Sequence, residues 1–262
     1  VEGLDPKREL PIIKRITIGS LRNKLLIILP IALILSEFAP WLLTPLLMLG
    51  GTYLCFEGAE KIWEKLLHKD AAEDAEEEKA AKPESEIVRG AVMTDFILSA
   101  EIMVISLNEV ASEGFLSRLI ILAIVAVVIT GVVYGVVALL IRMDDAGLKL
   151  ASTGSGALQT IGRGMVKAMP KILQVISVVG TVAMLWVGGH IILVGLDEFG
   201  WHALYGFVHH MGEAAAHVVP VLQAAVSWIV NTFFSAVLGL IWGAIIVVVV
   251  TLIQTARGKS AH

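Results

Sequence analysis

The sequence is poor in the residue types that cover a water-soluble domain, and it has almost no cysteine. Only 17% of its 262 residues are charged, whereas soluble domains carry roughly 25%. The single cysteine, Cys55, lies in an apolar stretch, so neither a disulfide framework nor a cysteine-based metal cage can form within one chain. We interpret Cys55 as a buried packing residue.

The sequence also lacks the signatures of enzymes and of nucleic-acid-binding proteins. It contains no nucleophile elbow, Walker loop, dinucleotide fingerprint or zinc-protease helix. The net charge is −4, and six of the 24 acids stand in one run at residues 70–78, so no basic surface for nucleic acid is indicated. We therefore expect the protein to be neither an enzyme nor a nucleic-acid-binding protein.

What the sequence does have is apolar residues, which make up 56% of the chain and give a mean hydropathy of +0.82. They form near-continuous stretches, several of which reach the roughly 20 residues that cross a bilayer core. The expected fold class is all-α, a polytopic transmembrane helix bundle of about six spans that occupies residues 1–262 as a single domain. The predicted spans are 25–38, 41–61, 87–110, 116–141, 170–196 and 232–254.

Basic residues orient this bundle. Of the 20 lysines and arginines, all but Arg118 fall on one side of the membrane in this threading. Since cytoplasmic loops are enriched in basic residues, we expect both ends of the chain to be cytoplasmic, in a bacterial inner membrane. Residues 66–86 then form a flexible cytoplasmic loop and residues 142–170 a cytoplasmic connector. The segment 197–231 is periplasmic, and its stretch 201–219 is either an interfacial helix or re-entrant.

Two acids lie in the apolar part of the third span, Asp95 in its inner half and Glu101 near its middle. An acid at the centre of a transmembrane helix costs roughly 2.5–3.5 kcal/mol on insertion scales, so each needs a partner or a function. At helical spacing Asp95 and Ser99 share one face, while Glu101 and Asn108 form a second stripe about 120° away.

No predicted span contains a lysine or arginine near its middle, so we do not expect a static buried ion pair at these acids. Three alternatives remain open. The carboxyls are protonated and join helices through hydrogen bonds, they face a hydrated cavity, or they bind a cation.

Two further residues are weaker candidates for the same pathway. Glu57 lies near the inner end of the second span, where Lys61 at i,i+4 offers pairing at a helix end as the alternative. His190 lies in the outer third of the fifth span, where simple packing is the alternative. Outside the predicted core, His210 and His217 share a helical face that could bind a metal.

Glycine spacings indicate close packing between the predicted helices. Gly131 and Gly135 form one GxxxG pair, and Gly239 and Gly243 form another. Such pairs let helix backbones approach each other in a membrane. They predict a bundle and carry no information about function.

Several segments resemble known families. Arg8-Glu-Leu-Pro11, the run 39–60, Met143-Asp-Asp-Ala-Gly147 and Met184-Leu-Trp-Val-Gly-Gly189 resemble the YedI-like family of uncharacterised bacterial inner-membrane proteins. That resemblance implies an inner-membrane protein with an amino-terminal segment ahead of Val1.

A more distant likeness involves the third span. Gly50-Gly51, followed by Glu57 and then Asp95-x-x-x-Ser99-x-Glu101, is similar to the TerC-type membrane proteins. That resemblance implies a role in metal-ion homeostasis, with Asp95 and Glu101 as ligands of a bound divalent cation such as manganese.

The leading hypothesis is a transporter or exporter of a small cation, including a divalent metal, with Asp95 and Glu101 as ligands or proton carriers. Ser99 and Asn108 would add neutral oxygen donors, and hard oxygen ligands suit manganese, calcium or magnesium better than copper or zinc. The alternative is a non-transporting structural or accessory membrane protein. The expected partners are the lipid bilayer, a second copy in a homo-oligomer, and a protein partner at the cytoplasmic loops.

Overall fold

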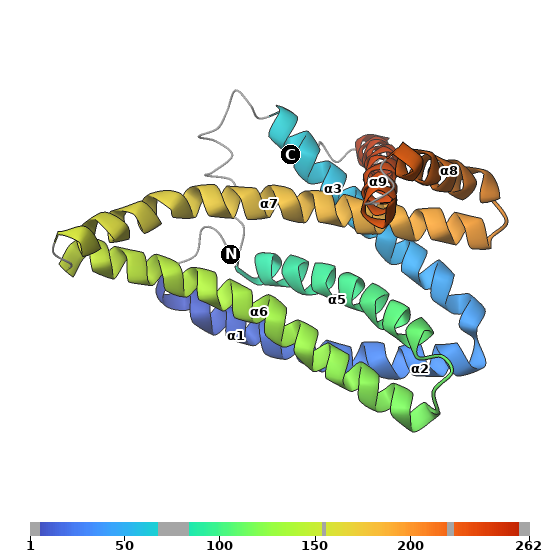
Figure 1. The fold of residues 1–262 in the computed structure, drawn as a ribbon, viewed down its shortest axis with the longest axis horizontal. Helices are drawn as coiled ribbons and strands as arrows, with labels where there is room; N and C mark the ends of the chain where they lie inside the picture. The colour runs from blue at the N-terminus through green and yellow to red at the C-terminus, as the bar shows by residue number, and fades with distance from the viewer. Residues whose placement is uncertain (1–5, 68–83, 154–155, 219–222, 257–262) are drawn as a thin grey trace. The chain divides into compact units, whose positions relative to one another are not determined.

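The computed structural model describes residues 6–67, 84–153, 156–218 and 223–256, and every regular element in these ranges is helical (Figure 1). This confirms the all-α prediction. The elements are α1 (Pro6–Asn23), η1 (Lys24–Ile28), α2 (Leu29–Phe38), η2 (Pro40–Leu42), α3 (Leu43–Leu67), α5 (Glu84–Glu109), α6 (Phe115–Thr153), α7 (Ala157–Glu198), α8 (His202–Val218) and α9 (Gln223–Ala256).

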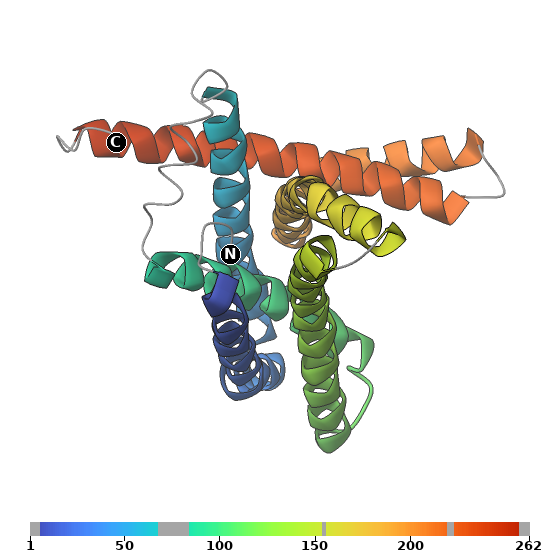
Figure 2. The same cartoon turned by 90° about the vertical axis from the view of Figure 1, so that its left-hand side faces the viewer.

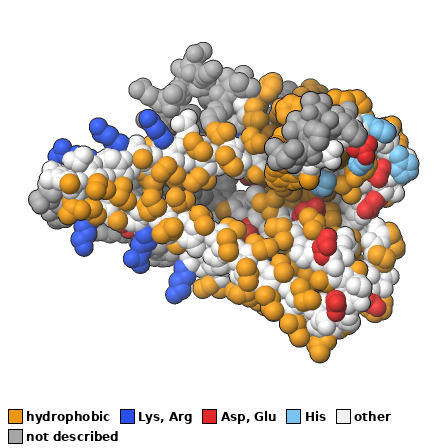
Figure 3. Space-filling view, in the orientation of Figure 1, with side chains coloured by type: hydrophobic (Ala, Val, Ile, Leu, Met, Phe, Trp, Pro, Cys, Tyr) orange, Lys and Arg blue, Asp and Glu red, His pale blue; other side chains and the backbone are white. Residues whose placement is uncertain are grey.

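Within the described residues, six helical segments are long and apolar enough to cross a membrane, in agreement with the predicted number of spans. They are Ile13–Phe38, Pro40–Trp63, Val88–Glu109, Phe115–Ser152, Ala157–Glu198 and Gln223–Ile253. Many of their large apolar side chains point outward, and orange side chains cover much of the α6 surface in Figure 3. Such a surface suits hydrocarbon rather than water, so the chain is a multi-pass membrane protein.

The chain divides into two compact units. Unit 1 contains residues 1–38 and 72–178, and unit 2 contains residues 39–71 and 179–262. Helix α7 contributes its first part to unit 1 and its second part to unit 2. The two chain ends and most of the predicted loop at 66–86 lie outside the described residues, so their cytoplasmic placement stays a prediction.

Unit 1 begins with a helix that runs from α1 through η1 into α2 without a break. The middle turn, η1, is a π-helix, in which the N–H of Leu29 donates to the carbonyl of Lys24 five residues earlier. Proline has no N–H, and its ring clashes with the carbonyl four residues back in a regular α-helix. We attribute the wider π turn to Pro30, which follows it directly.

This continuous helix corrects the predicted start of the first span. The prediction placed Lys24 just outside the membrane and began the span at Leu25, because basic residues usually mark the end of a span. In the structure the helix is continuous, and the candidate span runs from Ile13 to Phe38. Lys24 therefore lies within this candidate span, not before its start.

The predicted connector at 142–170 is largely helical. Helix α6 continues past Arg142 to Thr153, and α7 begins at Ala157, so the two form a long hairpin. The hairpin is held by backbone contact, since a Cβ added to Gly162 would collide with the backbone of Leu150 and Ala151. At roughly 1.5 Å per residue, both helices exceed the length needed to cross a bilayer.

The core of unit 1 forms where α2, α5 and α6 pack together. Its buried side chains are all apolar and come from each of these helices and from η1. They are Ile28, Leu29, Ala32, Leu33, Met103, Leu107, Leu122 and Ala126.

Unit 2 is held together by direct backbone contact among α3, α7 and α9. A Cβ added to Gly239 would collide with the carbonyl oxygen of Leu185, and one added to Gly243 would collide with that of Cys55. Figure 2 shows α3 crossing α9, which is the crossing that Gly243 permits. The second predicted GxxxG pair is thus used for packing, whereas nothing lies within 4 Å of a Cβ added to Gly131 or Gly135.

Within the predicted periplasmic segment at 197–231 the structure has a helix, α8, which packs along α9 in unit 2 (Figure 2). Its side of the membrane, and the choice between an interfacial and a re-entrant position, remain predictions.

Candidate ion site

The most buried charged group among the described residues is Lys24, whose side chain is 3% exposed. Its Nζ lies 3.1 Å from Oδ1 and 3.1 Å from Oδ2 of Asp95. Asp95 is 20% exposed on its side chain. The ammonium therefore faces both carboxylate oxygens, which is the geometry of a charge-assisted hydrogen bond.

Ser20 completes the contact. The ammonium of Lys24 donates to Oγ of Ser20 at 2.6 Å, and the Ser20 hydroxyl donates to Oδ2 of Asp95 at 2.5 Å. The ring of Tyr134 lies beside them, with its centroid 5.9 Å from the ammonium nitrogen, within the range of a cation–π interaction. Three oxygen atoms and one aromatic face thus surround a single positive charge.

Helical spacing explains how these groups converge. Ser20 and Lys24 are four residues apart on the first helix, so they lie on one face, and Asp95 and Ser99 have the same spacing on α5. The first helix packs against both α5 and α6, and α6 contributes Tyr134. The site therefore combines three helices of unit 1.

Ser99 is close to the pair but does not contact the carboxylate. It is buried, and its hydroxyl donates to the backbone carbonyl of Asp95 on its own helix. Such a bond satisfies the hydroxyl locally. The predicted role of Ser99 as an oxygen donor would need this bond to open.

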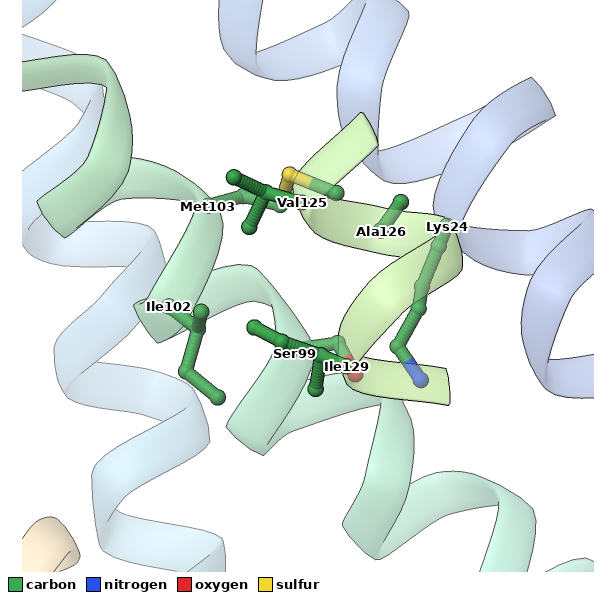
Figure 4. Close-up of a pocket in the computed structure, with 7 residues that line it drawn as sticks. All are labelled: Lys24, Ser99, Ile102, Met103, Val125, Ala126 and Ile129. Carbon is green, nitrogen blue, oxygen red and sulfur yellow. The ribbon is translucent and has the colours of Figure 1, made fainter. Parts of the chain in front are cut away.

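A small cavity adjoins Lys24 and Ser99, with room for about one water molecule. Figure 4 shows the Lys24 nitrogen and the Ser99 oxygen on the same side of it. The remaining lining is apolar, from Ile102, Met103, Val125, Ala126 and Ile129. Met103 and Ala126 also belong to the apolar core, so the polar site borders an apolar layer on one side.

This geometry corrects one inference from the sequence. The prediction that no lysine or arginine could neutralise the buried acids, and that a static ion pair was therefore not expected, is wrong for Asp95. The error follows from the misplaced start of the first span. The sequence holds only a partial signal, since Ser20 and Lys24 stand four residues apart and so share one helical face.

Glu101 and Asn108 are not part of this contact. Glu101 follows Asp95 by six residues on α5, which places it about 120° around and about 9 Å along the helix. Its buried Oε2 has no hydrogen-bond partner among the described residues. Asn108 is exposed near the end of α5, where its carbonyl accepts from the N–H of Ala111.

No three histidine, cysteine, aspartate or glutamate side chains in the described part of the chain are grouped so that they could hold a metal ion. The structure therefore does not bring Asp95 and Glu101 together as part of such a group. This leaves the predicted divalent site without a matching arrangement in the described ranges.

The two secondary candidates belong to unit 2, whereas Asp95 belongs to unit 1. Glu57 accepts from Lys61 at 2.8 Å, the i,i+4 pairing that the sequence offered as the alternative. His190 is half-buried on α7.

Three histidines of α8 lie close to acidic side chains. His202 Nδ1 lies 2.7 Å from Asp197, and His209 and His210 lie 3.6 and 3.8 Å from Glu213. The side chain of His217 is outside the described part of the structure.

Comparisons with known proteins place the chain in a family without giving it an activity. No curated protein and no solved structure matches the chain. The resemblances to YedI-like and TerC-type proteins therefore remain expectations from the sequence. One family model covers residues 1–249, nearly the whole chain. The chain thus belongs to the family described as "Protein of unknown function (DUF808)".

Proposed function

We propose that this protein transports a small cation across a bacterial inner membrane and that Asp95, held by Lys24, is its cation-binding group. The observation that carries the proposal is the ion pair itself, located among three helices of a membrane-spanning bundle. Charged residues inside membrane spans are expensive and commonly mark ion pathways.

A purely structural role explains this pair less well. Removing two charges from water costs several kcal/mol for each ion, and replacing a buried pair by apolar residues is often neutral or stabilising. An apolar bundle such as unit 1 could therefore pack α1 against α5 without Lys24 and Asp95. A site that must exchange cations, in contrast, needs a carboxylate in the membrane and something to neutralise it when it is empty.

In this proposal Lys24 neutralises Asp95 in the state without substrate. An arriving cation displaces the ammonium from the two carboxylate oxygens, and the ammonium returns when the cation leaves. The π turn that begins at Lys24 supports such a movement, because π turns inside helices are frequent at functional sites. The apolar core beside the cavity would separate the site from one side of the membrane.

We also propose that the end of the bundle where α6 and α7 meet lies in the cytoplasm. Lysine and arginine side chains gather over this part of the hairpin in Figure 3. Cytoplasmic ends of membrane helices are enriched in these residues. Arg118, the exception in the sequence, lies at the start of α6 and pairs with Glu37 at 3.4 Å, so its charge is balanced where it stands.

Flux through purified protein in proteoliposomes tests the proposal, with rubidium, sodium and manganese as tracer ions. We expect uptake of at least one tracer above protein-free vesicles, and we expect Asp95→Asn to abolish it. Glu37→Gln is the matched control, because it also removes one acid from a lysine or arginine pair in unit 1 but lies at the helix end. It should leave uptake near that of the wild type.

The competing role is that of a structural or accessory membrane protein. It predicts no uptake of any tracer, or uptake that Asp95→Asn and Glu37→Gln change equally. Either result, with both variants folded, would reject transport at Asp95.

A further inference from the structure

We infer that the cation taken at Asp95 is monovalent, an inference that rests on the proposed transport function and specifies its substrate class. The ammonium of Lys24 already occupies the site as a single positive charge held by oxygen atoms. It stands where a free cation would bind, so its surroundings report what the site accepts.

The distances favour a large monovalent cation. The three oxygen atoms around the ammonium nitrogen lie 2.6, 3.1 and 3.1 Å away. Magnesium and calcium bind oxygen at about 2.0–2.6 Å and take roughly six to eight ligands. Two of the three distances around the ammonium exceed that range, and Ser20 and Asp95 together offer fewer oxygen atoms than such a site.

The charge count leads to the same conclusion. Asp95 contributes one negative charge, and Ser20, Ser99 and Tyr134 are neutral donors or an aromatic face. A monovalent cation at the carboxylate makes a neutral pair, as the ammonium of Lys24 does now. With the displaced ammonium of Lys24 still in the bundle, a divalent cation places one more positive charge among apolar residues than a monovalent cation does, which is strongly unfavourable.

A second acid does not change this balance. Glu101 lies about 9 Å further along α5 and on a different side of it. No metal-holding group of three acidic, histidine or cysteine side chains occurs within the described ranges. The site thus differs from the divalent site that the sequence suggested, in which both acids were ligands.

The inference can be tested by removing the Lys24 ammonium from the oxygen atoms of Ser20 and Asp95. Lys24→Met removes the tethered ammonium and keeps an unbranched apolar stem. Thermal unfolding of this variant is then measured in rubidium, potassium, ammonium, choline and manganese chlorides at equal ionic strength. We expect an upward shift of about 5 °C at saturating rubidium, potassium or ammonium, and no shift with manganese beyond that with choline.

Two variants control for effects outside the site. Lys24→Met combined with Asp95→Asn should lose the shift, because the carboxylate is gone. Arg118→Met removes the cation from the pair with Glu37, a side chain that is 52% exposed. Since water competes for that acid, Arg118→Met should show no difference among the cations.

A manganese shift that exceeds the rubidium shift and requires Asp95 would overturn the inference, as would a monovalent shift that survives Asp95→Asn. If Lys24→Met does not fold, competition for tracer flux in the wild type gives the answer. Ammonium should then inhibit rubidium uptake while manganese does not, and the reverse order contradicts the inference. Selective binding of monovalent cations without flux would reject the proposed transport but not the monovalent site. Manganese flux that depends on Asp95 would reject the monovalent site but not transport.

Discussion

Removing one or both members of the Lys24–Asp95 pair should reveal strong energetic coupling. Stranding one member of a buried ion pair costs about 3–5 kcal/mol, whereas replacing both is often neutral or stabilising. Lys24 is 3% exposed and Asp95 is 20% exposed. Asp95→Asn leaves the more deeply buried ammonium without a partner, so it should lower the free energy of unfolding more than Lys24→Met, which leaves the carboxylate without one. Both losses should lie near this range. The double variant should lie within about 1 kcal/mol of the wild type.

The coupling energy of this cycle follows from these values. The two single losses together should exceed the loss of the double variant by about 5 kcal/mol or more, which is above the roughly 0.5–3 kcal/mol that contacting residues usually show. Thermal or denaturant unfolding in detergent, followed by the fluorescence of the protein's 6 tryptophans, measures each variant. The pair Glu37–Arg118 is the matched control, and its coupling should stay below about 1 kcal/mol because Glu37 is largely exposed.

Additive effects would refute this reasoning. If the double variant loses as much stability as the sum of the two single variants, the side chains do not share a contact. The same holds if the control pair couples as strongly as Lys24 and Asp95.

Two further predictions concern the packing of unit 2. Gly239→Ala should lower stability by about 1–3 kcal/mol, because the added Cβ would collide with the carbonyl oxygen of Leu185. Gly131→Ala is the control, since nothing lies within 4 Å of its Cβ, and it should be neutral or stabilising by up to about 1 kcal/mol. Equal losses in thermal unfolding would contradict the helix contact. Thr52→Val should cost about 1 kcal/mol or more, because the indole N–H of Trp242 donates to Thr52 Oγ1 at 3.1 Å, and an unchanged melting temperature would show that this bond does not contribute.

The sequence predicts the number of spans well because their signal is local. Each stretch is long and apolar enough to be recognised without knowledge of its neighbours, and all six correspond to helices in the structure. The ends are harder to place. Lys24 and Arg142 resemble the ends of spans in the sequence because they are basic, although the helix continues past both.

The candidate site was predicted in part. Asp95 was identified because an acid in an apolar span is unusual, whatever surrounds it. Its partner was missed because Lys24 is 71 residues away in the sequence and contacts Asp95 only through the packing of α1 against α5. Glu101 carries the same local signal, yet it is absent from the ion-pair contact, since helical spacing cannot tell which neighbour each face meets.

The central claim is that Asp95 is a cation site which Lys24 fills in this structure. Anomalous diffraction from rubidium in crystals of Lys24→Met tests it most directly. We predict a rubidium peak at the position that the Lys24 ammonium leaves, about 3 Å from the oxygen atoms of Asp95 and Ser20. Rubidium peaks elsewhere with none at Asp95, or a substituted methionine side chain that fills this position completely, would contradict the claim.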